Sequence, residues 1–232
     1  MIISSKFQVL YFFFIADYIK PCPGLTSECL KTNILETIPL FVKGIPSLGI
    51  NSSDPLYQDK LDLELPGGLQ IHFRDGTLTG FRKCVVESVS YVNLESNLSL
   101  RCNLTIKGKY TATGRILIVT INGDGDAKIK TPNIRFDAKL RFQDVVRDGV
   151  EYRLVKDYKV NYQFGDKVTF ALTNLFKGNP QLSETVLLFL NENWKQIVDE
   201  FGKPIVDAII KATFGNIEKF FEKIPKNELI VD

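Results

Sequence analysis

The chain has 232 residues, of which 44% are hydrophobic and 24% are charged, and its formal net charge is +2. This composition is typical of a globular protein and excludes a disordered or collagen-like chain. A net charge so close to zero gives no basic surface for DNA or RNA, so no nucleic-acid partner is expected. The length is sufficient for one large domain or two small ones.

The first residues have the pattern of a targeting segment. Lys6 is followed by an apolar run over residues 7–16, FQVLYFFFIA, and such a run after a positive charge is typical of a secretory signal. We therefore predict a signal peptide over residues 1–16, with cleavage open as far as residue 20, and a single domain over residues 17–232. The alternative is a buried strand or helix. No comparable apolar run follows, so no membrane span is expected.

Four cysteines and three glycosylation sequons fit an exported chain. An even number of cysteines is favoured in an oxidising compartment, and a bridge between Cys22 and Cys29 would tie the N-terminus to the helix that follows. For Cys84 and Cys102 the even count favours a bridge, but strand parity places Cys84 on the wetter face of its strand, so this pairing stays open. The sequons begin at Asn51, Asn97 and Asn103.

A short helix is predicted after residue 26, where Thr26 or Ser27 can cap it. From residue 61 the apolar residues recur with a period of two, which predicts an antiparallel sheet with one wet and one dry face. The turn at residues 147–149 indicates hairpins. The alternating segments are residues 61–65, 69–73, 98–106, 134–142 and 152–162.

Two segments in the middle of the predicted sheet need separate interpretation. Residues 115–121, RILIVTI, are apolar on both faces, so we expect both faces to be covered. Residues 122–126, NGDGD, resemble the start of a calcium loop, but Ala127 and Asn133 occupy the positions that require Gly and Glu. A hairpin turn is predicted there instead, because Asn-Gly and Asp-Gly favour hairpins.

After residue 182 the period returns to that of a helix, which Ser183 can cap and which Gly202 and Pro204 should kink. A helical region of some forty residues needs an apolar partner along its length, and the dry face of the sheet is the candidate. Trp194, the only tryptophan, lies on the apolar stripe, so it either packs in the core or lines a cavity. The stripe contains Val186, Leu187, Leu190, Trp194, Ile197, Phe201 and Ile205.

The sequence has little of what catalysis requires. Its only histidine, His72, lies at a polar position of a strand, where an ordinary surface residue is the simpler interpretation. No nucleophile elbow, phosphate-binding loop or His-Glu-x-x-His motif occurs, and the cysteine spacing is not that of a zinc site. We therefore expect no enzyme, no metal and no cofactor. The many aromatic residues either fill a core or line an apolar cavity.

Three segments resemble the insect takeout and juvenile-hormone-binding protein family. They are residues 43–56, KGIPSLGINSSDPL, residues 108–125, GKYTATGRILIVTINGDG, and residues 174–194, NLFKGNPQLSETVLLFLNENW. The similarity covers nearly all of the predicted mature chain. It implies an α+β fold: a long C-terminal helix wrapped by a strongly curved antiparallel β-sheet, with a short N-terminal helix and an apolar tunnel inside.

The resemblance also implies a secreted carrier that binds a small apolar lipid, such as a terpenoid hormone or a fatty acid, in the tunnel. The alternative is a secreted signalling or sensory protein, linked to feeding or circadian rhythm, that acts through a protein receptor. A monomer is expected, with the family's disulfide between Cys22 and Cys29. Ligand contacts are expected from inward residues of strands and helix: Phe73, Phe136, Leu140, Phe142, Phe170, Leu187, Leu190 and Trp194.

Overall fold

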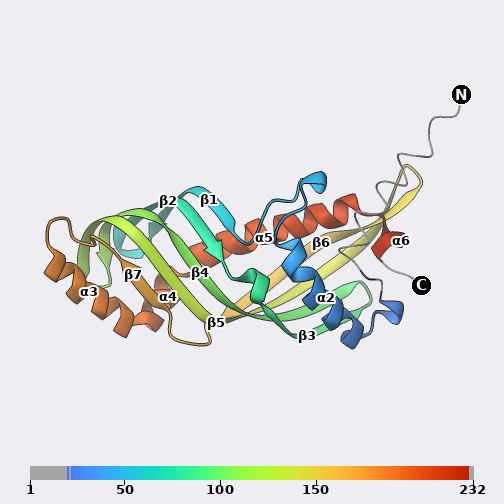
Figure 1. Ribbon diagram of the computed structural model, residues 1–232, viewed down its shortest axis with the longest axis horizontal. Helices are drawn as coiled ribbons and strands as arrows, with labels where there is room; N and C mark the ends of the chain where they lie inside the picture. The colour runs from blue at the N-terminus through green and yellow to red at the C-terminus, as the bar shows by residue number, and fades with distance from the viewer. Residues whose placement is uncertain (1–19, 21, 230–232) are drawn as a thin grey trace, which may run out of the picture.

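The computed structural model describes residue 20 and residues 22–229, so the predicted signal peptide lies outside the described residues. A single antiparallel sheet of seven strands dominates the fold (Figure 1). The strands are β1 (Leu56–Leu65), β2 (Leu69–Thr79), β3 (Val85–Val92), β4 (Glu95–Ile116), β5 (Val119–Arg147), β6 (Val150–Gln163) and β7 (Thr169–Leu172). Their order is β1-β2-β4-β5-β6, with β3 also paired to β4 and β7 to β5.

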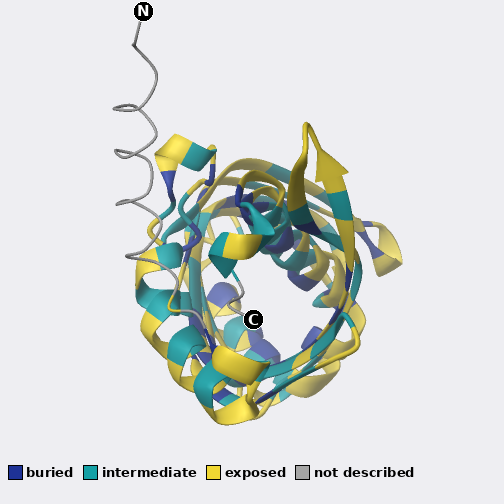
Figure 2. Cartoon of the chain, turned by 90° about the vertical axis from the view of Figure 1, so that its right-hand side faces the viewer, coloured by how far each residue is buried: buried dark blue, intermediate teal, exposed yellow. Residues whose placement is uncertain are grey.

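The helices are α2 (Ser27–Phe41), α3 (Pro180–Glu192), α4 (Trp194–Phe201), α5 (Lys203–Lys223) and α6 (Lys226–Leu229). Short 3-10 turns occupy Pro23–Leu25, Pro46–Leu48, Pro66–Gly68 and Phe81–Lys83. The sheet curves strongly without closing, and α5 packs against β6 along the long axis of the molecule (Figures 1 and 2). This confirms the predicted fold class. None of the described helices is long and apolar enough to cross a membrane.

The predicted C-terminal helix is broken in two places. The expected break at Gly202 separates α4 from α5, and Pro204 follows in the first turn of α5. A second break, at Asn193 with φ −100° and ψ 25°, separates α3 from α4 and was not predicted. The predicted cap was wrong, because Asn179 rather than Ser183 caps α3 by accepting a hydrogen bond from a backbone N–H of the first turn.

The hairpin turn predicted at residues 122–126 is also wrong, because these residues continue β5 and pair with residues 109–113 of β4. Their glycines permit close packing: a Cβ atom at Gly123 would lie 2.9 Å from the hydroxyl oxygen of Tyr110, and one at Gly125 would clash with the carbonyl oxygen of Thr173. The real turn lies at residues 117–118. Ile118 is 80% exposed there, so the expectation that residues 115–121 are covered on both faces was wrong.

A β-bulge explains why the parity argument about Cys84 failed. Val86 and Val89 are both buried, although they are three residues apart, because the pairing of β3 with β4 shifts register between Val86 and Ser88. Val85 follows Cys84 directly, so parity would place it on the drier face, yet it is 56% exposed. Cys84 precedes the strand and forms a disulfide with Cys102 of β4. A second disulfide joins Cys22 and Cys29 at the N-terminal end of α2.

A second bulge, between Arg141 and Phe142 of β5, reverses parity in part of β6 and buries Arg153. The Arg153 guanidinium donates two hydrogen bonds to the Asp144 carboxylate, at 2.8 and 2.9 Å, and Lys226 of α6 lies 2.7 Å from the same carboxylate. The hydrogen bonds from Arg153 lower the pKa of Asp144 to about 2. This ion cluster fastens α6 to the sheet.

Candidate ligand-binding cavity

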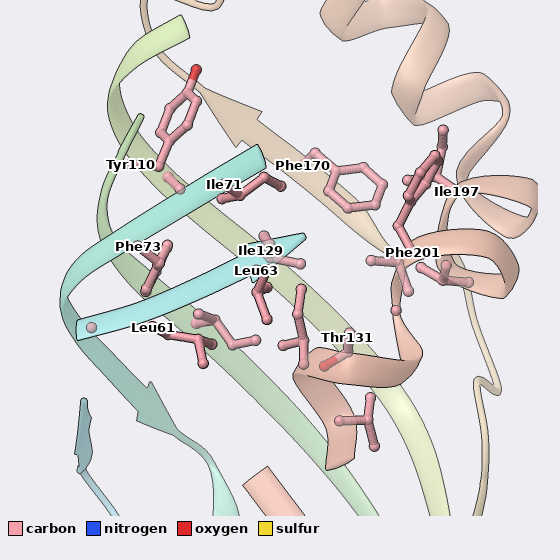
Figure 3. A pocket seen from close by; sticks show the side chains of 18 of the residues that line it. Leu61, Leu63, Ile71, Phe73, Tyr110, Ile129, Thr131, Phe170, Ile197 and Phe201 are labelled. Carbon is pink, nitrogen blue, oxygen red and sulfur yellow. The ribbon is translucent and has the colours of Figure 1, made fainter. Parts of the chain in front are cut away.

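An apolar cavity of about 210 Å³ lies between the concave face of the sheet and the helices α3–α5 (Figure 3). Aliphatic and aromatic side chains from β1, β2, β4, β5 and β7 form one wall, and residues between Leu190 and Ile209 form the other. On the helical side the lining residues include Leu190, Ile197, Val198, Phe201, Ile205, Val206 and Ile209. The predicted apolar interior is therefore hollow at this end of the molecule.

The alternation of the sequence places the strand residues in this wall. Leu61, Leu63 and Leu65 of β1 point into the cavity, whereas the acidic residues between them are exposed. The hairpin register sets Leu61 opposite Phe73 and pairs the two following leucines with apolar residues of β2. Because cross-strand partners lie on the same face, each pair adds two apolar side chains to the wall.

Few polar groups reach the cavity, and none of the described residues that line it is charged. The Tyr110 hydroxyl donates a hydrogen bond to the carbonyl oxygen of Thr173 at 2.9 Å, and burial raises its pKa to about 12. The Thr131 hydroxyl donates to a backbone carbonyl of β4 at 3.4 Å. Gln58 and Thr77, on the neighbouring strands β1 and β2, complete the polar part of the lining.

The cavity ends where α5 meets a cluster of aromatic rings. The ring of Phe214 stacks on Tyr158 of β6 with 4.2 Å between centroids, and Phe221 lies 5.1 Å from Phe142 of β5. Leu140 belongs to the same buried cluster. These side chains fill the space beyond Ile209, so the interior consists of a hollow end and a filled end.

The family model of the haemolymph juvenile hormone binding protein matches residues 3–231. The chain belongs to this family. Its structure is similar to the crystal structure of Takeout 1 from Epiphyas postvittana, with a TM-score of 0.87 and 36% identity over 92% of this chain and 100% of the other. Its sequence is 25% identical to the circadian clock-controlled protein daywake of Drosophila yakuba over 90% of this chain and 86% of that protein. A shorter match, 26% identical over 45% of this chain and 43% of the other, is to a putative beta-carotene-binding protein of Schistocerca gregaria.

In this takeout-like fold the eight expected contact residues fall into two groups. Phe73, Phe136, Phe170 and Leu190 line the cavity. The other four are absent from its lining, and Leu140 and Phe142 lie in the filled end. Leu187 and Trp194 are partly buried, and Trp194 opens α4 directly after the break at Asn193. The remaining lining is mostly leucine and isoleucine, which were not among the expected contact residues.

Asn191 lies outside the predicted apolar stripe of the helix, but it joins the helix to the sheet. Its side-chain oxygen accepts a hydrogen bond from the N–H of Phe170, and its nitrogen donates to the carbonyl oxygen of Phe170, both at 2.9 Å. The nitrogen also donates to the carbonyl oxygen of Leu187 at 2.9 Å. Asn191 therefore completes the free edge of β7 and fixes the position of Phe170 in the cavity wall.

The outer surface carries the only histidine. His72 is part-exposed, and its Nδ1 lies 2.8 Å from a carboxylate oxygen of Asp62 on the neighbouring strand β1. Hydrogen bonds from Lys60 and then His72 lower the pKa of Asp62. No group of three or more His, Cys, Asp or Glu side chains that could hold a metal ion occurs within residue 20 and residues 22–229.

Proposed function

We propose that the protein is a secreted carrier that holds a small apolar lipid in the cavity between the sheet and α3–α5. The observation that carries the proposal is a cavity wall of aliphatic and aromatic side chains without a charged group. Each methylene of a ligand transferred there from water contributes about 0.8 kcal/mol. A chain of about ten methylenes thus supplies roughly 8 kcal/mol before the cost of immobilising it.

Membership of the juvenile hormone binding family supports a binding role, as does the local likeness to a putative beta-carotene-binding protein. Secretion is supported by the apolar run at residues 7–16 and by the two disulfides. The three sequon asparagines, Asn51, Asn97 and Asn103, are all exposed, so attached glycans would project into solvent. We propose no catalytic role, because the single histidine pairs with Asp62 on the outer surface.

The proposal is tested by expressing the full chain in insect cells and collecting the medium. Protein purified from the medium should shift in mobility after glycosidase digestion and should release a reproducible, near-stoichiometric lipid into organic solvent, identified by mass spectrometry. Protein retained in the cells would contradict secretion. Purified protein that yields no lipid and binds no apolar compound by calorimetry would contradict the carrier role.

A second candidate is a secreted signalling protein that acts through a protein receptor. The likeness to daywake, a protein described as circadian clock-controlled, supports this alternative. The lipid extraction separates the two candidates. A protein that still triggers its biological response while its cavity is empty would favour a signalling role through a receptor. Loss of that response when the lipid is removed would favour the carrier role.

A further inference from the structure

We infer that the cavity accepts uncharged lipids and rejects ionised carboxylates of the same chain length. This inference deepens the proposed carrier function and rests on it. A carboxylate enters an apolar site only if a cation or several free hydrogen-bond donors replace the water it loses. The composition of this cavity wall therefore determines which lipid head groups it tolerates.

The wall supplies no cation, since none of the described lining residues is Lys, Arg or His. Two of its hydroxyl groups already donate to backbone carbonyls, those of Tyr110 at 2.9 Å and Thr131 at 3.4 Å. The side-chain nitrogen of Gln58 donates to the carbonyl oxygen of Lys60 at 2.7 Å. A carboxylate would thus lose its hydration without gaining comparable partners.

The beginning of α5 adjoins the cavity at Gly202 but is poorly suited to hold an anion. The Gly202 N–H donates to the carbonyl oxygen of Val198 at 2.9 Å, and Pro204 in the first turn has no N–H. The ammonium group of Lys203 is exposed and pairs with Asp207 on the outside of the helix. The helix start therefore offers little to offset the lost hydration.

An uncharged polar group loses less hydration free energy than a carboxylate does when it enters the cavity. Gln58 of β1 lines the cavity and pairs with Gly76 of β2. One of its two side-chain N–H groups donates to Lys60, so the other can donate a single hydrogen bond to an ester, a ketone or an alcohol. The ligand class that fits is an extended apolar molecule with at most one or two neutral polar groups.

The test compares methyl dodecanoate with dodecanoate, which have the same chain and differ in charge at pH 8. Each is titrated into the delipidated full-length protein, and displacement of the fluorescent probe N-phenyl-1-naphthylamine reports binding. The ester should bind at least about 100-fold more tightly, because only the carboxylate loses hydration without gaining a partner. Lowering the pH to 5, where more of the dodecanoate is protonated, should reduce the difference in affinity between the two compounds.

Two matched variants test the cause of the selectivity. Gln58 lines the cavity from an exposed position of β1, so Gln58→Arg places a cation at the rim with little risk to folding. The control is Tyr57→Arg, which adds the same charge at a neighbouring residue that is 66% exposed and does not line the cavity. Gln58→Arg should strengthen dodecanoate binding about tenfold without strengthening ester binding, and Tyr57→Arg should change neither.

The inference is overturned if the wild-type protein binds the two compounds within about threefold of each other at pH 8. It is also overturned if a large difference persists unchanged in Gln58→Arg, because the missing cation would then not be the cause. Failure of the underlying carrier function looks different: neither compound would displace the probe or bind by calorimetry, although circular dichroism shows a folded protein.

Discussion

Replacement of Asn191 by alanine tests whether one side chain holds the cavity wall in place. The change removes two hydrogen bonds to the backbone of Phe170, each of 2.9 Å, and leaves one donor and one acceptor of β7 unpaired. At about 1 to 1.5 kcal/mol for each group left without a partner, the loss is about 2 to 3 kcal/mol. Alanine favours a helix interior over asparagine by about 0.6 kcal/mol, so the net destabilisation should be about 2 kcal/mol.

The measurement is urea denaturation followed by circular dichroism, together with affinity for an apolar probe. Because Phe170 lines the cavity, Asn191→Ala should lower the affinity for the probe as well as the free energy of unfolding. Asn193→Ala is the matched control: Asn193 donates one side-chain bond, at 2.8 Å, to the carbonyl oxygen of Phe189 within the same helical segment. Should Asn191→Ala lose no more stability than Asn193→Ala, the reasoning about β7 would be refuted.

Three further outcomes are expected. The pKa of Asp144 is about 2, against an ordinary value of 3.8, which implies about 2 kcal/mol of stability. This contribution is present above pH 4 and is lost as the pH falls towards 2. Asp144→Asn should abolish that part of the acid dependence, measured by denaturant titrations at each pH. Leu190→Ala, at a buried residue of the cavity wall, should lower the free energy of unfolding by about 2 to 3 kcal/mol, whereas Leu188→Ala, 59% exposed, should stay within about 0.5 kcal/mol. Trp194 lies outside the cavity lining, so its fluorescence maximum should stay constant while calorimetry records binding; a saturable blue shift would contradict this placement.

Much of the sheet could be predicted because burial on one face imposes a period of two. Leu61 and Leu63 follow the rule and line the cavity. The rule fails at bulges, where one extra residue on a strand moves the following side chains to the other face. Val86 and Val89 are both inward for this reason. A bulge depends on the pairing of two strands, which a single strand's pattern does not contain.

Turns were predicted at two glycine-containing segments, residues 147–149 and 122–126, and only the first of them is a turn. Asp148 and Gly149 adopt φ values of 50° and 77° and form the tight turn between β5 and β6. Gly123 and Gly125 instead lie within β5, where side chains would collide with Tyr110 and with the segment after β7. The local sequence is similar in both places. The contact of Gly125 with Thr173 involves a residue some fifty positions further along the chain, which the local sequence does not reveal.

The hollow part of the interior could not be predicted, because hollowness depends on the sum of side-chain volumes across facing elements. Phe136 and Phe142 share one strand and one face, yet Phe136 lines the cavity whereas Phe142 packs against Phe221. What changes between them is the facing helix. Opposite the cavity α5 presents aliphatic residues such as Val206 and Ile209, and opposite the filled end it presents aromatic rings. Since the strands are similarly apolar along both parts, the change in residue size along α5 sets where the cavity ends, and therefore how long a ligand fits.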